Sequence, residues 1–432
     1  MATEMGGRRN TYLLALIFSI FFAISLLTNI LGPIVPDIID TYKLSLTAAA
    51  LLPFAFFIAY GVMSVPAGII VEVYKEKRVI TGAFLAAFVG ALSFAVLPIY
   101  PVVMASLFVI GAGMATLQVA INPLLRVAGG EEHFAFNSAF AQVVFGLASF
   151  LSPQLYSYLV RNLGKDSGPP SFALQWLARL VPPDRPWVSL YWIFVFITLL
   201  MMLLISASKF PDVQRTAEEQ VGSWEAHRKL LHNPIVLLYF ITIFAYVGSE
   251  QGTANWISKF LAEYHHYDPH TTGANAVSWF WGLLTGGCLA GMLLLKIFDS
   301  RKVLVATSIA ALSALTVALF GPGRLSVIAF PLVGLFASVM WPISISLALN
   351  SVSECHGSFA GILCTGIVGG ATTPVIIGRL GDFVGLRWGM TFLYVTFGWV
   401  LGVGFWAKPL VANETIGSTR TKENSPRQHE RT

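Results

Sequence analysis

The chain has 432 residues, of which 56% are hydrophobic and only 11% carry a charge. Soluble domains carry about 25% charged residues, and a soluble core could not bury this much apolar surface. The composition therefore excludes an ordinary soluble protein and predicts a membrane protein. The formal net charge of +5 is typical of the basic bias of cytoplasmic loops, so it does not indicate an anionic partner.

The charged residues are clustered, and eleven runs of 20 or more residues contain no Asp, Glu, Lys or Arg. About 20 apolar residues span the hydrocarbon core of a bilayer as a helix, so each run is a candidate transmembrane segment. The run 79–125 is 47 residues long with Pro98 and Pro101 near its centre, which predicts two helices joined by a tight turn. The sequence thus predicts an all-α membrane protein with twelve transmembrane helices. The runs are 10–36, 44–71, 79–125, 133–160, 186–208, 230–249, 269–295, 303–323, 325–353, 355–378 and 388–407.

Twelve spans leave no loop long enough for a soluble catalytic, nucleotide-binding or DNA-binding domain. The chain has no phosphate-cradling GxxxxGK[ST] loop, which argues against an ATP-driven pump. Its cysteines, Cys288, Cys355 and Cys364, show no CxxC spacing. We therefore expect no enzyme, no cofactor, no metal ion and no nucleic-acid partner.

The charge-dense stretch 209–229 separates six predicted helices from six others. The two halves have similar sequence patterns, since Arg78 follows Gly68 by ten residues and Arg301 follows Gly291 by the same interval. Parallel six-helix repeats of this kind place a binding site between the halves, near the middle of the membrane. The prediction is two pseudo-symmetric six-helix bundles, 1–208 and 234–408, with a cytoplasmic linker 209–233 and a disordered cytoplasmic tail 409–432.

Lys and Arg residues are distributed unevenly between the two sets of loops. Eighteen fall on the side of the N-terminus and eight on the opposite side. Because cytoplasmic loops are enriched in Lys and Arg, this bias predicts that both termini are cytoplasmic. We expect a multi-pass protein of the cell's inner (plasma) membrane, embedded in the lipid bilayer as a monomer.

The seventh predicted helix carries Glu250, the only acidic residue well inside a span. A carboxyl group in the hydrocarbon region is protonated, paired or bound to a cation. Glu250 is therefore a candidate for contact with the substrate or a coupling ion, and a structural hydrogen bond is the alternative. Gln251 and Asn255 lie four residues apart on one face of this helix and are candidates for ligand contact.

The fourth predicted helix offers Gln118, Asn122 and Arg126 at spacings of four, which places them on one face. Amide groups donate and accept hydrogen bonds to the hydroxyls of a sugar-like ligand, so Gln118 and Asn122 are candidates for substrate binding. Hydrogen bonds between helices are the alternative, and Arg126 fits a charge at the cytoplasmic end. In the first helix, Thr28 and Asn29 are polar and deep enough to line a cavity.

Tryptophan supplies a flat apolar face on which a pyranose ring can stack. The candidates for this role are Trp256, Trp279, Trp281 and Trp341, and Trp341 is the strongest because it lies mid-helix beside Pro342. The alternative is a position in the aromatic belt at the membrane surface.

Charged residues also lie at the outer ends of two helices. Asp37 and Asp40 fit a solvated interface, while Arg379 and Asp382 fit a local ion pair or, alternatively, an outer gate. An amphipathic stretch around 172–180 predicts a helix in the membrane interface.

Specific stretches resemble a known family. The twelve-helix plan is similar to that of the major facilitator superfamily, and the stretches are similar to its fucose, galactose and glucose:proton symporter family. They are PAGI (66–69), GAGMATLQVAINP (111–123), YVG (246–248), GSF (357–359) and IVGGATTPVIIG (367–378).

The resemblance implies sugar transport, but it also exposes departures from the family pattern. The fucose-transporting pattern has carboxylates in helices 1 and 4 that this chain lacks, and its helix 4 glutamate falls on Gln118. Members of the family that transport hexoses resemble this chain in having glutamine at the position of Gln118. The resemblance therefore implies glucose or galactose as the substrate rather than fucose. The pattern's helix 5 glutamine and asparagine fall on Phe140 and Val143, so the neighbouring Gln142 becomes the candidate in that helix.

We therefore expect a secondary transporter of a monosaccharide that works by alternating access. Coupling to a proton through Glu250, coupling to sodium and simple facilitated transport all stay open. The alternatives are an exporter of another small molecule and a non-transporting sugar sensor on the same scaffold. A sensor of that kind usually has long cytoplasmic extensions, whereas the polar tail here has only about 24 residues.

Overall fold

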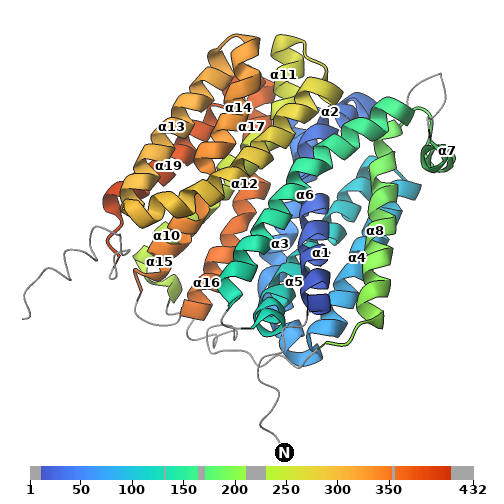
Figure 1. Ribbon diagram of the computed structural model, residues 1–432. Coiled ribbons are helices and arrows are strands. Elements are labelled where there is room, and N and C mark those ends of the chain that lie inside the picture. Colours follow the sequence, from blue (N-terminus) through green and yellow to red (C-terminus); the bar gives the residue numbers. More distant parts are fainter. Residues whose placement is uncertain (1–10, 131–132, 164–170, 211–229, 353–355, 410–432) are drawn as a thin grey trace, which may run out of the picture.

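The computed structural model describes residues 11–130, 133–163, 171–210, 230–352 and 356–409. In this part of the chain, twelve helical segments are long and apolar enough to cross a membrane, which confirms the predicted number of spans. They form two bundles, here called the first and the second bundle (Figure 1). Most of the predicted linker 209–233 and nearly all of the predicted tail 409–432 lie outside the described residues, so these domain boundaries stay predictions.

The first bundle is built from seven long helices and a short one, and the short helix α7 coincides with the predicted interfacial stretch. Its elements are α1 (Thr11–Thr28), α2 (Leu31–Tyr42), α3 (Leu46–Tyr74), α4 (Glu76–Val96), α5 (Tyr100–Gly129), α6 (Phe134–Leu163), α7 (Phe172–Ala178), the 3₁₀ turn η2 (Pro186–Val188) and α8 (Ser189–Ala207).

The second bundle has the same number of spans, several of them interrupted. Its elements are α10 (Pro234–Ala254), α11 (Ile257–His265), the π turn η3 (Pro269–Gly273), α12 (Ala274–Ile297), α13 (Ser300–Phe320), α14 (Gly323–Ala337), α15 (Met340–Leu349), α16 (His356–Thr365), the 3₁₀ turn η4 (Gly366–Val368), α17 (Gly369–Val384), α18 (Leu386–Gly389) and α19 (Phe392–Trp406).

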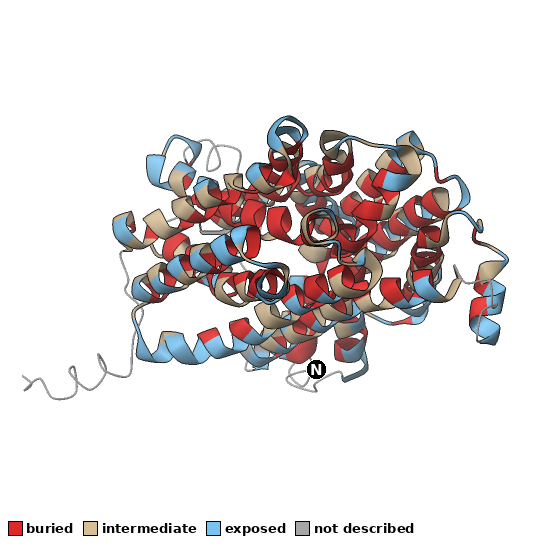
Figure 2. Ribbon diagram, turned by 90° about the horizontal axis from the view of Figure 1, so that it is seen from above, coloured by how far each residue is buried: buried red, intermediate tan, exposed pale blue. Residues whose placement is uncertain are grey.

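The two ends of the bundles are distinguished here as the N-terminal face and the far face. The N-terminal face is where α1 begins, and there the Tyr12 hydroxyl lies 2.9 Å from the Ser208 hydroxyl. The far face is where α2 and α11 end (Figure 1). Seen along the helices, buried residues gather between the helices and exposed residues lie mainly at the rim (Figure 2). This pattern fits a protein whose rim contacts lipid.

Among the described residues, three spans are each interrupted near the middle by two non-helical residues, and in two of them a proline explains the break. Asn29 and Ile30 separate α1 from α2, and Ser338 and Val339 separate α14 from α15. Proline lacks the N–H that would bond to the carbonyl four residues earlier. Pro33 therefore leaves the Asn29 carbonyl without its helical partner, and Pro342 does the same to Ser338.

The third break lies at Asn255 and Trp256, between α10 and α11, where the chain has no nearby proline. Here the side-chain amide of Asn255 donates to the Gln251 carbonyl at 2.8 Å. Side-chain amides that bond locally to the backbone compete with the helical pattern. The first and seventh spans, which occupy equivalent places in the two repeats, are thus both broken at an asparagine.

The two bundles meet mainly where α3 packs on α17, α6 on α12, and α2 on α11. At the centre, Gly32 in α2 approaches the break of the seventh span so closely that a Cβ at this position would lie 2.3 Å from the Ala254 carbonyl oxygen. Only glycine fits such an approach. The breaks of the first and seventh spans therefore lie against each other between the bundles.

Candidate functional site

Glu250 lies in α10, one turn before the break, and is held by donors from its own helix. The Tyr246 hydroxyl donates to Glu250 Oε2 at 2.6 Å, and the Gln251 side-chain amide donates to Oε1 at 3.3 Å. No Lys, Arg or His in the described part of the chain forms an ion pair with this carboxylate. A carboxyl group inside a span with hydrogen-bond donors but no basic partner is suited to taking up a proton or a cation.

Trp341 lies beside Tyr246 and so places a second aromatic ring near Glu250. Its ring centroid lies 6.0 Å from that of Tyr246, with the planes tilted by 50°. Trp341 is partly exposed, and it sits in the first turn of α15, just after the break. The Ser338 carbonyl freed by Pro342 accepts a hydrogen bond from the Cys288 thiol at 3.1 Å, so the broken backbone is satisfied from α12.

The predicted residues at the seventh-span break are all buried. Gln251 is 5% exposed, Asn255 4% and Trp256 1%. The Gln251 side chain points between the bundles, because its Cγ would lie 3.0 Å from a Cβ on Gly370 of α17 and the same Cβ would lie 3.4 Å from Phe57 of α3. In this conformation the Trp256 ring presents no open face for stacking.

Asn29 marks the equivalent break in the first bundle. Its side-chain amide donates to the Ser149 hydroxyl at 2.8 Å, and that hydroxyl lies 2.6 Å from the Ser25 hydroxyl. Both serines escaped the sequence-based prediction, because a serine in a transmembrane helix usually bonds to its own backbone and gives no distinctive signal. The break of the first span is thus tied to α6 by polar contacts.

The remaining candidates lie on the first bundle and are more accessible. Gln118 is partly exposed, and Asn122 and Gln142 are exposed, although all three lie inside transmembrane helices. The Asn122 amide donates to the Gln118 carbonyl at 3.2 Å, one turn back. No hydrogen bond links Gln118 or Gln142 to the Glu250 group within the described residues. The structure therefore places the candidates in two sets, one on each bundle.

At the far face, side chains that were not predicted to interact join the two bundles. Asp37, read from the sequence as a solvated residue, accepts a hydrogen bond from Tyr156 of α6 and lies 3.3 Å from the Nε2 of His270 in η3. The Gln154 amide donates to the Asn275 side chain at 2.5 Å. These contacts pair residues more than 100 positions apart, and no local pattern in the sequence could have indicated them.

The expected ion pair between Arg379 and Asp382 is not what the structure contains. The Arg379 guanidinium lies 5.5 Å from the centre of the Phe383 ring, and Asp382 instead bonds to the start of α3 in the first bundle. The alternative interpretation, a role in an outer gate, agrees with this cross-bundle bond. Among the described residues no group of three or more His, Cys, Asp and Glu side chains could hold a metal ion.

The sequence pattern of the Major Facilitator Superfamily matches residues 17–366, which is most of the chain. The chain belongs to the Major Facilitator Superfamily. Together with the twelve spans, this membership makes it a multi-pass membrane transporter rather than an enzyme.

Similar curated proteins include the glucose/galactose transporter of Brucella abortus, which is 28% identical over 89% of this chain and 92% of its own length. The L-fucose-proton symporter of Escherichia coli is 27% identical over 88% of this chain and 89% of its own length.

Solved structures show the same fold. The Escherichia coli fucose:proton symporter matches with a TM-score of 0.65 at 23% identity, over 93% of this chain and 100% of the other. A bacterial homologue of the human lysosomal transporter Spinster, in an inward-facing and occupied conformation, matches with a TM-score of 0.77 at 13% identity, over 93% of this chain and 97% of the other.

Proposed function

We propose that this protein transports a monosaccharide, a hexose such as glucose or galactose, across the inner membrane by alternating access. The relatives named as glucose/galactose transporters and L-fucose-proton symporters, which align over nearly the whole chain, support a sugar substrate. Glutamine at position 118 favours a hexose over fucose. The excess of Lys and Arg on the N-terminal face supports cytoplasmic termini.

The observation that carries the proposal is the meeting of two broken helices, one from each bundle, beside the polar candidates. Gly32 brings the break at Asn29 against the break at Asn255. Discontinuous helices at the interface of two repeats are where secondary transporters bind substrate, because rocking of the bundles then exposes the same groups to either side. Uptake into proteoliposomes under an imposed gradient gives the direction of transport.

The contacts between the bundles support a conformation that is closed at the far face. The polar bonds of Asp37, Gln154 and Asp382 gather there. Toward the N-terminal face, Asn122 and Gln142 are exposed within their spans. We infer that a sugar reaches Gln118, Asn122, Gln142 and Trp341 from the N-terminal face, and that it contacts Asn29, Gln251, Asn255 and Trp256 when the breaks separate.

We assign the coupling role to Glu250. Its neighbour Tyr246 and the partly exposed Trp341 place the carboxyl next to the surface on which the sugar would stack. A carboxyl that carries a proton in one conformation and releases it in another couples sugar movement to a proton gradient. Sodium binding by the same carboxylate is the second possibility, and the ion gradient used in the experiment separates the two.

The test is uptake of radiolabelled glucose, galactose and fucose into proteoliposomes that contain the purified protein. We expect accumulation of a hexose under an imposed proton gradient, and exchange of labelled for unlabelled hexose without any gradient. Absence of uptake and exchange for all three sugars would contradict the proposed function. Accumulation driven by sodium alone would reject proton coupling but keep sugar transport.

The role of Glu250 is tested by Glu250→Gln. This variant keeps the shape of the side chain but cannot ionise, so it should lose gradient-driven accumulation and keep exchange. Glu263→Gln is the matched control, because Glu263 is an exposed residue of α11 that pairs with Lys259 at 3.5 Å. Normal accumulation by Glu250→Gln would show that another group couples the ion.

A further inference from the structure

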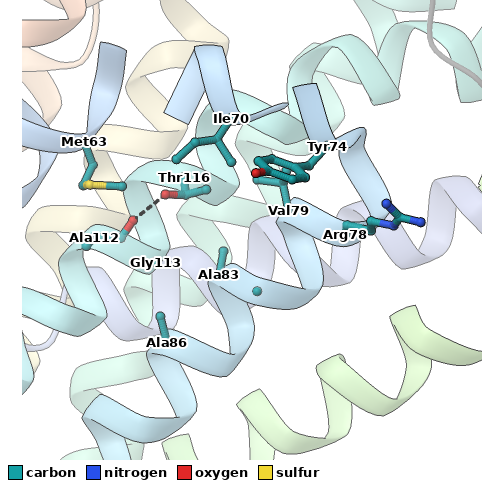
Figure 3. Close-up of a pocket in the computed structure, with 11 residues that line it drawn as sticks. Met63, Ile70, Tyr74, Arg78, Val79, Ala83, Ala86, Ala112, Gly113 and Thr116 are labelled. Carbon is teal, nitrogen blue, oxygen red and sulfur yellow. Dashed lines mark hydrogen bonds between the residues drawn. The ribbon is translucent and has the colours of Figure 1, made fainter. Parts of the chain in front are cut away.

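A groove runs between α3 and α4, away from the candidate site. Both helices pack along α5 but touch each other little, so α5 forms the floor of the groove. The groove encloses about 390 Å³ near the N-terminal face (Figure 3). Small residues make up its floor and the α4 wall, and bulkier apolar residues make up the α3 wall. The lining residues used here are Met63, Ile70, Gly82, Ala83, Ala112 and Thr116.

The groove opens on the side of the bundle that faces lipid. Thr116 on its floor precedes Gln118 by two residues, and two residues turn an α-helix by about 200°. The groove therefore lies on the opposite side of α5 from the Gln118 and Asn122 face that we assign to the sugar. The neighbouring apolar side chains Ile70, Leu85 and Val89 are exposed, as expected for a surface in contact with acyl chains.

Toward the centre of the membrane, the described residues that line the groove offer no unpaired polar side chain to water. The Thr116 hydroxyl donates to the Ala112 carbonyl at 2.8 Å, so the one hydroxyl on the floor already has a partner (Figure 3). The remaining lining side chains toward the centre of the membrane are apolar. The chemistry of this part fits a hydrocarbon chain.

The end of the groove at the N-terminal face has a different character. Tyr74 and Arg78 line it there, and both side chains are exposed (Figure 3). No described residue forms a hydrogen bond or ion pair with the Arg78 guanidinium. The adjacent Lys77, by contrast, donates to the carbonyls of Ser206 and Ser208 at 2.8 and 2.7 Å. An exposed guanidinium at the level of the lipid headgroups can bind a phosphate through two parallel hydrogen bonds.

We propose that this groove is a binding site for an anionic phospholipid, with one acyl chain between α3 and α4 and the headgroup phosphate at Arg78. An acyl chain gains little by moving from the bilayer into an equally apolar groove, so selectivity must come from the headgroup. Basic sites of this kind between transmembrane helices bind anionic headgroups on the cytoplasmic side, which is the predicted side of the N-terminal face. The site does not depend on the identity of the sugar or the coupling ion.

Native mass spectrometry of the purified protein tests this site directly. The protein is titrated with phosphatidylglycerol and, separately, with phosphatidylcholine of the same acyl chains, and the affinity of the first bound lipid is compared. We expect phosphatidylglycerol to bind more tightly. Arg78→Gln should weaken phosphatidylglycerol binding about five-fold, as expected for the ~1 kcal/mol contributed by one basic residue near a membrane surface.

A second variant tests the acyl-chain part of the site. A Cβ on Gly82 would meet no atom within 4 Å, so the side chain of Gly82→Leu would enter the groove without disturbing the fold. We expect this variant to lower the affinity for both lipids. The matched controls are Gly398→Leu, at another open glycine in α19, and Arg324→Gln, which removes an exposed arginine at the far face.

Equal binding of the two lipids by the unaltered protein would overturn the proposal, because the headgroup would then play no part. Equal loss of phosphatidylglycerol binding in Arg78→Gln and Arg324→Gln would also overturn it, since the attraction would then be a general effect of positive charge. These readouts are independent of transport, so they stand whether or not the protein carries a hexose.

Discussion

The carboxylate of Asp382 accepts two hydrogen bonds from Thr47, a residue that lies 335 positions earlier in the chain and in the other bundle. The Thr47 backbone N–H donates to Oδ2 at 2.9 Å and the Thr47 hydroxyl donates to the same oxygen at 2.5 Å. The backbone N–H of Leu46 donates to Oδ1 at 2.8 Å. Asp382 of the second bundle thus caps the first turn of α3 in the first bundle, where free N–H groups and the helix dipole favour a negative charge.

The first prediction is that Asp382→Ala opens the far face. Loss of a helix cap costs about 0.5–2 kcal/mol, and this cap exists only while the bundles touch. The population closed at the far face should therefore fall about two- to thirty-fold relative to the open one. The distance across the far face is measured by double electron–electron resonance in a protein without its native cysteines. The spin labels are placed at Arg161→Cys in α6 and at Arg324→Cys in the first turn of α14.

Asp299→Ala is the control for this experiment. Asp299 caps α13 by accepting a hydrogen bond from the backbone N–H of Arg301 at 3.0 Å. It is therefore a helix cap like Asp382, but it lies within a single bundle. This variant should lower thermal stability without changing the distance across the far face. An unchanged distance distribution in Asp382→Ala would mean that the cross-bundle cap does not hold the far face closed.

The second prediction concerns the pair of Asp37 and His270. The two side chains lie 3.3 Å apart and belong to different bundles. Each of them should therefore stabilise the closed far face only when the other is present. Asp37→Asn and His270→Gln should each widen the distance across the far face. Combined, they should do little more than either alone, with a coupling free energy of about 0.5–3 kcal/mol. Strictly additive effects would contradict a direct interaction.

The partly exposed pair of Lys259 and Glu263 serves as the control for this pair of substitutions. These residues lie one turn apart on α11, within one bundle. Lys259→Gln and Glu263→Gln should leave the distance across the far face unchanged, separately and together, because this pair lies within one helix and does not join the bundles. Ion pairs near the surface contribute only about 0.2–1 kcal/mol.

The third prediction is that Gly32→Val separates the two broken helices. The new side chain would collide with the Ala254 carbonyl, and overpacking of this kind costs about 1–3 kcal/mol. We expect a wider distance across the far face and a large loss of hexose exchange. Gly398→Val, at a glycine with open space around its Cβ position, should fold and transport normally. Normal exchange in Gly32→Val would show that the close approach of the breaks is not needed for transport.

The fourth prediction concerns the partner of Glu250. Tyr246→Phe removes the hydroxyl that donates to the carboxylate at 2.6 Å but keeps the ring beside Trp341. A hydrogen bond to a charged group contributes about 1.5–3 kcal/mol, so the initial rate of gradient-driven uptake should fall about ten-fold or more, while exchange persists. Tyr158→Phe, at an exposed tyrosine of α6, should have no effect. A parallel loss of exchange would instead indicate that Tyr246 contacts the sugar.

The interior of the candidate site was only partly predictable from the sequence. Glu250, Gln251 and Trp341 stood out because polar and aromatic groups inside charge-free runs are costly and therefore few. Tyr246 was missed, although it lies four residues before Glu250 on the same helix face, and the i, i+4 rule could have found it. Pro33 and Pro342 likewise carried the signal for two of the helix breaks.

The contacts between the two bundles could not be predicted from helical spacing or from proline positions. Asp37 and Asp382 read as ordinary charges at helix ends, and their partners, His270 and Thr47, lie in the other half of the chain. Helical periodicity gives the face on which a side chain lies, but not the helix that covers that face. A prediction of local pairing, such as Arg379 with Asp382, was therefore wrong.

By itself, the sequence determined that this protein crosses the membrane twelve times. The thickness of the hydrocarbon core sets the length of every charge-free run, and that constraint acts on each segment separately. Which polar residues meet, and at which face the bundles close, was decided by tertiary structure. The physical reason is that a hydrogen bond between bundles depends on the packing of two distant helices, and in this chain a single close approach at Gly32 brings both breaks together.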